Sequence, residues 1–183
     1  MKLIGLGLLF VAVVLAWASG YQPKPGETVL VLAIEGRGNV SILLHTKEAP
    51  KTTAHIIDLA KKGFYDGQRF FRVITTPRPY IVQFGDPNTK SKPLDDPSIG
   101  QGGTGVRIPY EDSGKSNVVG AVGLSTPPKE RDAGDCQFYI NLSNNRFLDG
   151  SYTVFGQVVE GMDVVRRIEL GDRVTKATIV TGN

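Results

Sequence analysis

Short apolar runs with strand-like alternation dominate the chain from residue 27 onward. In these runs aliphatic, β-branched and aromatic residues either alternate with polar ones or follow one another, and Gly, Pro, Asn or Asp residues separate the runs. Runs of this kind between turn residues are typical of β-strands. The predicted strands are 28–34, 40–45, the two runs within 68–87 on either side of the turn at 75–79, 118–124, 137–142, 152–159 and 176–180. The pattern predicts a mainly β fold of eight strands, a sandwich or a barrel.

Two segments show helical spacing instead. Ala54, Ile57 and the pair Leu59 and Ala60 recur about three positions apart before Gly63, which predicts a helix of about three turns. A shorter helix is predicted at 161–168. These two helices leave little room for a second domain, so residues 27–183 are expected to form one domain.

A long segment without strand or helix pattern lies between Pro87 and Pro109. Gly, Pro, Asp, Ser and Thr dominate it, and Gly100–Gly105 reads GQGGTG. A phosphate-binding loop follows a strand and opens a helix, whereas Pro109 stands where that helix would run, so no nucleotide site is expected. A loop of this length inside a compact domain is usually functional. The charged stretch 129–135 is expected to be a solvated loop.

The first 20 residues are distinct from the rest. One Lys precedes an uncharged run from Leu3 to Ala18, which is short for a membrane-crossing helix of about 20 residues, and Ala16-Trp17-Ala18 has the small-x-small pattern of a signal-peptidase site. We expect a cleaved secretory signal, with an uncleaved membrane anchor as the alternative. Either makes the protein exported, periplasmic or secreted, or held at the membrane by residues 3–18. Residues 21–26 would be a short linker.

Composition excludes several kinds of site. The net charge of +3 is small and its charges are mixed along the chain, so no nucleic-acid partner is expected. A single cysteine, Cys136, excludes an internal disulfide and a thiolate-rich metal site. The two histidines, His45 and His55, have no Cys or carboxylate at ligand spacing, so neither a metal nor another cofactor is expected.

Two polar residues stand inside apolar strands. Side chains alternate between the faces of a strand, so Arg72 can share one wall of the sheet with Gln83 on the returning strand. Alternatively both point to solvent. Neither Ser125 nor Ser143 has a His in a recognisable motif, so an enzyme of this sequence would form no covalent intermediate.

Several short motifs occur in a specific order and spacing. They are FFRVI at 70–74, VQFGDP at 82–87, GQGGTG at 100–105, GAVGLS at 120–125, QFYINL at 137–142 and FLDGSYTVFGQVVEGMDVV at 147–165. In this set the region from about 27 to 168 resembles the cyclophilins, which are peptidyl-prolyl cis-trans isomerases. The resemblance implies a closed eight-stranded antiparallel β-barrel capped by two α-helices. It also implies a monomer that accelerates X-Pro rotation in unfolded or flexible proteins, with proline-containing polypeptides as partners.

The resemblance also assigns roles to residues. It makes Arg72 the catalytic donor and Gln83 the residue that orients it and binds a substrate carbonyl. The substrate-binding set implied by the family is Phe70, Tyr80, Ile81, Ser125, Thr126, Gln137, Phe138, Phe147, Leu148 and Tyr152. Of these, Tyr80, Ile81, Phe138 and Leu148 would line the proline socket, although by pattern alone Phe138 and Leu148 also fit the core.

The chain departs from the family pattern at several positions. Phe71 stands where a His often precedes the Arg, and Phe147 where many members have the Trp that contacts the inhibitor cyclosporin. Residues 75–80 form a longer link than in many cyclophilins, and 126–135 differs from the usual Asn- and Gly-rich loop. Two other hypotheses stay open: a proline-peptide-binding chaperone or scaffold without relevant turnover, and a structural barrel carried by its anchor.

Overall fold

The computed structural model describes residues 20–183, so the predicted signal or anchor segment lies outside the described residues. In chain order the elements are β1 Thr28–Ile34, β2 Gly38–Leu44, α1 Pro50–Lys61, β3 Arg72–Val73, β4 Ile81–Phe84, a 3-10 turn Pro87–Lys90, β5 Ala121–Leu124, β6 Phe138–Asn141, a 3-10 turn Arg146–Leu148, β7 Val154–Glu160, α2 Met162–Arg166 and β8 Val174–Thr181. All strands and both helices fall where the sequence pattern predicts them. The loop predicted at 87–109 contains only the 3-10 turn Pro87–Lys90, and the stretch without helix or strand extends to residue 120.

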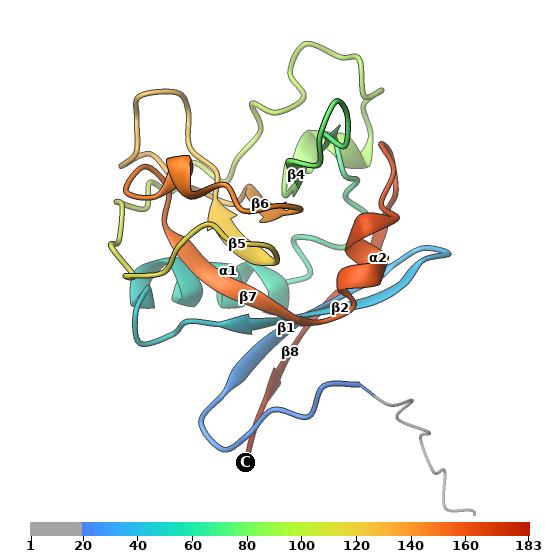
Figure 1. Ribbon diagram of the computed structural model, residues 1–183. Helices are drawn as coiled ribbons and strands as arrows, with labels where there is room; N and C mark the ends of the chain where they lie inside the picture. Colours follow the sequence, from blue (N-terminus) through green and yellow to red (C-terminus); the bar gives the residue numbers. More distant parts are fainter. Residues whose placement is uncertain (1–19) are drawn as a thin grey trace, which may run out of the picture.

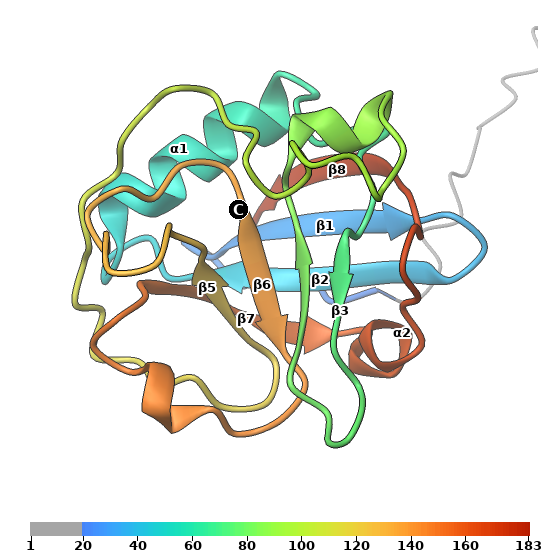
Figure 2. The ribbon, with the colours of Figure 1, turned by 90° about the horizontal axis from the view of Figure 1, so that it is seen from above.

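The eight strands of residues 20–183 form one strongly curled antiparallel sheet in the order β3-β4-β6-β5-β7-β2-β1-β8 (Figures 1 and 2). The helices lie at opposite ends of it, with α1 against β8 and α2 against β2. The predicted closure into a complete barrel is not confirmed, because β3 and β8 are the two edges of the ladder. A single antiparallel bridge, Arg69 to Arg173, joins the segments that lead into these edges. The sheet is a half-barrel.

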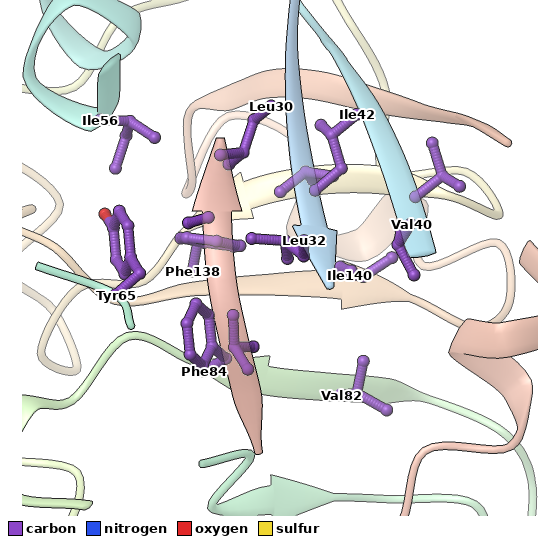
Figure 3. Close-up of a cluster of buried hydrophobic side chains, with 14 of the residues drawn as sticks. Leu30, Leu32, Val40, Ile42, Ile56, Tyr65, Val82, Phe84, Phe138 and Ile140 are labelled. Atoms are coloured by element: carbon purple, nitrogen blue, oxygen red, sulfur yellow. The ribbon is translucent and has the colours of Figure 1, made fainter. Parts of the chain in front are cut away.

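Alternation along β4 and β6 separates a core face from an outer face. Val82 and Phe84 of β4 and Phe138 and Ile140 of β6 point inward, among the side chains of β1, β2 and α1 (Figure 3). Phe138 packs its ring edge-on against Tyr65, Phe84 and Phe155, at centroid distances of 5.6, 5.4 and 5.7 Å. Ile81 and Tyr139 point outward and form a second cluster with Leu148. The outer face of β4 and β6 therefore carries its own apolar surface.

Residues 21–26, predicted as a linker, lie along the end of β8. Pro25 forms a parallel bridge with Gly182, and the Tyr21 hydroxyl donates to the Glu27 carboxylate at 2.7 Å. This segment and the C-terminus are on the side of the molecule away from β4 (Figure 1). Among residues 20–183, no helix is both long and apolar enough to cross a membrane.

Candidate functional site

A groove of about 780 Å³ runs over the outer face of the curled sheet. Strands β3, β4 and β6 form its floor, and the loops around residues 100–107 and 125–135 form its sides. Its lining includes nine of the twelve predicted site residues: Arg72, Tyr80, Ile81, Gln83, Ser125, Thr126, Gln137, Leu148 and Tyr152. Predicted site residues that lie far apart in the sequence, from Arg72 to Tyr152, thus line one groove.

Arg72 and Gln83 are directly opposed across the β3–β4 ladder. The Arg72 side chain is exposed, and its Nη1 donates to Gln83 Oε1 at 3.2 Å, the one hydrogen bond that its guanidinium makes to residues 20–183. Gln83 is 6% exposed. A guanidinium carries five N–H donors, so most of those of Arg72 are left for a ligand. The alternative in which both residues point to solvent does not hold, because Gln83 is buried, although Arg72 is exposed where it lines the groove.

The amide of Gln83 is held from its other side. Its Nε2 donates to Ser125 Oγ at 3.0 Å and to Gln137 Oε1 at 3.2 Å. Gln137 in turn donates from Nε2 to the carbonyls of Gly100 and Gly102 at 3.0 and 2.8 Å. Both hydrogens of the Gln83 amide are therefore used, so its oxygen must face Arg72. A continuous chain of hydrogen bonds therefore runs from the glycine-rich loop through Gln137 and Gln83 to the guanidinium of Arg72, and it orients that guanidinium.

Two carboxylates shape that loop. Asp86 is fully buried and accepts hydrogen bonds from the backbone N–H groups of Asn88, Gly100 and Gly102. Asp135 accepts from Thr104 and Gly105 at 2.6 and 3.0 Å. A Cβ at Gly102 would overlap the Asp86 carboxylate, which explains why this position needs glycine. The glycines bring the backbone close to protein carboxylates, and their N–H groups are thereby occupied.

An apolar socket adjoins Arg72. Ile81, Tyr139 and Leu148 form its floor, and Tyr80 and Tyr152 are partly exposed at its sides. Tyr139 stacks edge-on against Tyr152 at 5.7 Å and donates its hydroxyl to Asn117 Oδ1 at 2.8 Å. Burial raises the pKa of Tyr139, and burial also raises that of Tyr80 against the opposing effect of Arg72. Both phenols stay neutral at physiological pH, so the socket presents apolar ring surface.

Two predicted substrate contacts lie in the core instead. Phe138 is 1% exposed, because it alternates with Gln137 and Tyr139 and thus points to the opposite face of β6. Tyr139 takes the place in the socket that was predicted for Phe138. The same alternation, counted from Gln137, would have found it in the sequence.

Phe70 is also 1% exposed and packs against Phe84 at 5.2 Å. It was predicted as a substrate-binding residue, and regular alternation would place it on the same face as Arg72. The chain is irregular there: Phe70 exchanges backbone hydrogen bonds with Gly171 and Asp172, whereas Phe71 N–H donates to Gln83. This change of partner between 70 and 71 breaks the alternation and turns the Phe70 ring into the core.

Phe147 is on the rim of the site and not in its lining. Its side chain is 66% exposed, and its ring stacks on Tyr80 at 5.9 Å with an interplanar angle of 17°. Within residues 20–183, no group of His, Cys, Asp and Glu is arranged to hold a metal ion. The site therefore consists of one oriented cation, a buried amide and an apolar socket.

Known proteins are similar to this chain over most of its length. The family model described as cyclophilin type peptidyl-prolyl cis-trans isomerase/CLD matches residues 29–181. A peptidyl-prolyl cis-trans isomerase of Helicobacter pylori is 34% identical over 82% of this chain and 86% of the relative. A probable peptidyl-prolyl cis-trans isomerase of Brucella suis is 33% identical over 93% of this chain and 91% of the relative.

Solved structures share the fold. A cyclophilin type peptidyl-prolyl cis-trans isomerase of Cryptosporidium parvum superposes with a TM-score of 0.73 at 18% identity, over 86% of this chain and 99% of that one. The same protein, crystallised in the presence of the dipeptide Ala-Pro, gives a TM-score of 0.68 at 20% identity, over 85% and 99% of the two chains.

Proposed function

The chain belongs to the cyclophilin-type peptidyl-prolyl cis-trans isomerases, and from that membership we propose that its groove holds an X-Pro segment with the proline ring in the socket and Arg72 against the prolyl nitrogen. The enzyme accelerates rotation about the X-Pro bond. The Ala-Pro dipeptide named with the Cryptosporidium structure supports a proline-containing substrate for this chain as well.

The reaction is a rotation about one amide bond. The planar X-Pro amide has partial double-bond character, so its rotation has a barrier of about 20 kcal/mol. A catalyst must favour the twisted state over both planar ones. In the twisted state the prolyl nitrogen regains its lone pair and accepts a hydrogen bond, which it cannot do while planar. A fixed donor at that nitrogen therefore stabilises the transition state selectively.

Arg72 meets this requirement. It is permanently charged, and its fork of donors is planar. The observation that carries the proposal is the hydrogen bond from Arg72 to Gln83 beside the apolar socket, because it fixes the cation where a bound proline would exclude water. Exclusion of water lowers the local dielectric and strengthens the contact.

Gln83 acts as a positioning residue. It was also expected to bind a substrate carbonyl, but both of its Nε2 hydrogens are already donated to Ser125 and Gln137. We therefore assign it the orientation of Arg72 alone. The exposed edges of Ser125, Thr126 and Gln137 line the groove next to it and are left to contact the peptide backbone.

We propose that this reaction assists protein folding outside the cytoplasm. The apolar run 3–18 and the Ala16-Trp17-Ala18 pattern support export. Residues 20–27 are on the side of the molecule away from β4 (Figure 1).

Nuclear magnetic resonance exchange spectroscopy on a short Ala-Pro-Phe peptide tests the isomerase function directly. Catalytic amounts of the protein should produce exchange peaks between the cis and trans forms, which interconvert over tens of seconds unaided. A peptide that binds, as shown by shifted peaks, without accelerated exchange would favour the binding-module hypothesis. The absence of both binding and accelerated exchange would contradict the proposed function.

A further inference from the structure

In the loop 129–132 (Lys-Glu-Arg-Asp), the acidic and the basic side chains have different surroundings. Glu130 pairs with Arg107 at 3.4 Å, and Asp132 accepts the backbone N–H of Tyr110 at 3.0 Å. Lys129 and Arg131 line a second hollow of about 550 Å³. All four residues are exposed, as expected of a solvated loop. In addition, its acidic residues contact the segment around residues 107–110, and its basic residues line the hollow.

This hollow is continuous with the groove. Thr126, Leu148 and Tyr152 line both, and Gly150 and Ser151 complete the second one. Since Leu148 and Tyr152 also form the proline socket, a peptide with its proline in the socket has a flanking residue at the hollow. Consecutive residues of an extended peptide advance by about 3.3 Å, so that residue is within a few positions of the proline.

The charged residues that line the hollow, Lys129 and Arg131, are both basic. No carboxylate lines it, and neither Lys129 nor Arg131 forms an ion pair with any residue from 20 to 183. Asp149, which lies between the lining residues Leu148 and Gly150, is engaged by Asn117, whose backbone N–H and side-chain Nδ2 donate to it at 2.7 and 3.0 Å.

Arg131 is also held in place. Its guanidinium lies over the ring of Tyr110, 4.7 Å from the centroid, and its Nη1 donates to the Gly150 carbonyl at 3.4 Å. A cation positioned in this way loses less conformational entropy when it binds a carboxylate.

We propose that this hollow is a subsite for an acidic side chain, Asp or Glu, on the substrate within three residues of the X-Pro bond. The proposal rests on the proposed function and adds a substrate class to it. Each partly solvated ion pair of this kind changes affinity by roughly 2- to 5-fold, so the two cations together set a preference of about 5- to 20-fold.

The test uses a set of Ala-Pro peptides that differ only in a Glu, Gln or Lys at one of the three positions on either side of the X-Pro bond. The kcat/KM is measured by exchange spectroscopy, which needs no coupling protease, and the Kd by titration. At one position or two adjacent ones, Glu should exceed Lys by about 5- to 20-fold in both quantities. Raising the ionic strength to about 1 M should remove most of this preference. Equal values for Glu, Gln and Lys at every position would overturn the proposal.

Charge reversal locates the effect. In the double variant K129E/R131E the Glu-to-Lys preference should invert, whereas in the matched control K47E/R166E it should persist, because Lys47 and Arg166 are exposed residues that do not line the hollow. A preference that survives K129E/R131E would contradict the assignment. If no peptide is turned over, the proposed function fails, and the Kd series still decides the subsite.

Discussion

Arg72 and Gln83 face each other across the β3–β4 ladder, and the amide of Gln83 can present only its oxygen to the guanidinium. Its nitrogen is committed to Ser125 and Gln137. The orientation of the proposed catalytic donor is therefore set by groups that do not contact the proline, and this gives Gln83 a role separable from that of Arg72.

The first prediction concerns Gln83. Gln83→Leu keeps most of the side-chain volume but removes the acceptor of Arg72, so kcat should fall by about 10-fold while KM changes less. Gln101→Leu, at a groove residue outside the hydrogen-bond chain, serves as the control and should retain kcat within about 2-fold. Steady-state kinetics decides between them, and an unchanged kcat in a folded Gln83→Leu would contradict the positioning role.

The second prediction compares Phe138, which lies in the core, with Tyr152, which lies at the side of the socket. Phe138→Leu should lower the free energy of unfolding by about 1 to 2 kcal/mol, because its ring fills the space between Tyr65, Phe84 and Phe155. Tyr152→Ala, at a partly exposed residue, should instead raise KM and leave the free energy of unfolding nearly unchanged. Urea unfolding and steady-state kinetics on both variants give the answer. A rise in KM for Phe138→Leu larger than that for Tyr152→Ala would return Phe138 to the site.

Alternation explains both what the sequence predicts and what it misses. The Arg72 and Gln83 pairing was predictable, since each is an isolated polar residue in an apolar strand. Phe138 and Tyr139 are adjacent aromatics of similar size, so only the phase of β6 distinguishes them. The inward turn of Phe70 was not predictable, because it depends on backbone pairing with residues 171 and 172, a hundred positions away.

The closure of the sheet is a second feature that the sequence could not predict. Spacing and composition predict eight strands, but whether β3 pairs with β8 depends on the curvature of the whole sheet, which no local pattern encodes. In the loop 129–132, Arg131 likewise gains its direction through contacts with Tyr110 and Gly150, and its acidic neighbours Glu130 and Asp132 are held by Arg107 and Tyr110. Local sequence gives the charges but not the side of the loop to which they point.

Processing of the N-terminus is the third prediction. The short apolar run and Ala16-Trp17-Ala18 favour cleavage by signal peptidase, so the intact mass of protein from the exported fraction should correspond to a chain that begins near Ser19. Full-length protein recovered only from membranes would show that the segment is retained as an anchor.

The fourth prediction follows from Phe147 on the rim. Its ring offers apolar surface over Tyr80 but no donor, whereas a Trp there donates its indole N–H to cyclosporin. A carbonyl of the inhibitor buried without a partner costs about 1 to 3 kcal/mol, or roughly 5- to 150-fold in affinity. The protein should therefore be only weakly inhibited by cyclosporin, and Phe147→Trp should restore inhibition more than it changes kcat/KM. Nanomolar inhibition of the unmodified protein, or no gain in the Trp variant, would contradict this explanation.

The role of Arg72 is tested most directly by the kcat/KM of Arg72→Ala and Arg72→Lys, with Arg78→Ala as the control on the neighbouring exposed turn. Arg72→Ala should lose about 100-fold or more, a loss of about 3 kcal/mol of transition-state stabilisation, with the fold intact by circular dichroism. Arg72→Lys should recover only part of it, because an ammonium lacks the planar fork that Gln83 orients. Arg78→Ala should keep its activity. A folded Arg72→Ala whose kcat/KM stays within about 2-fold of the unmodified protein would remove Arg72 from the mechanism.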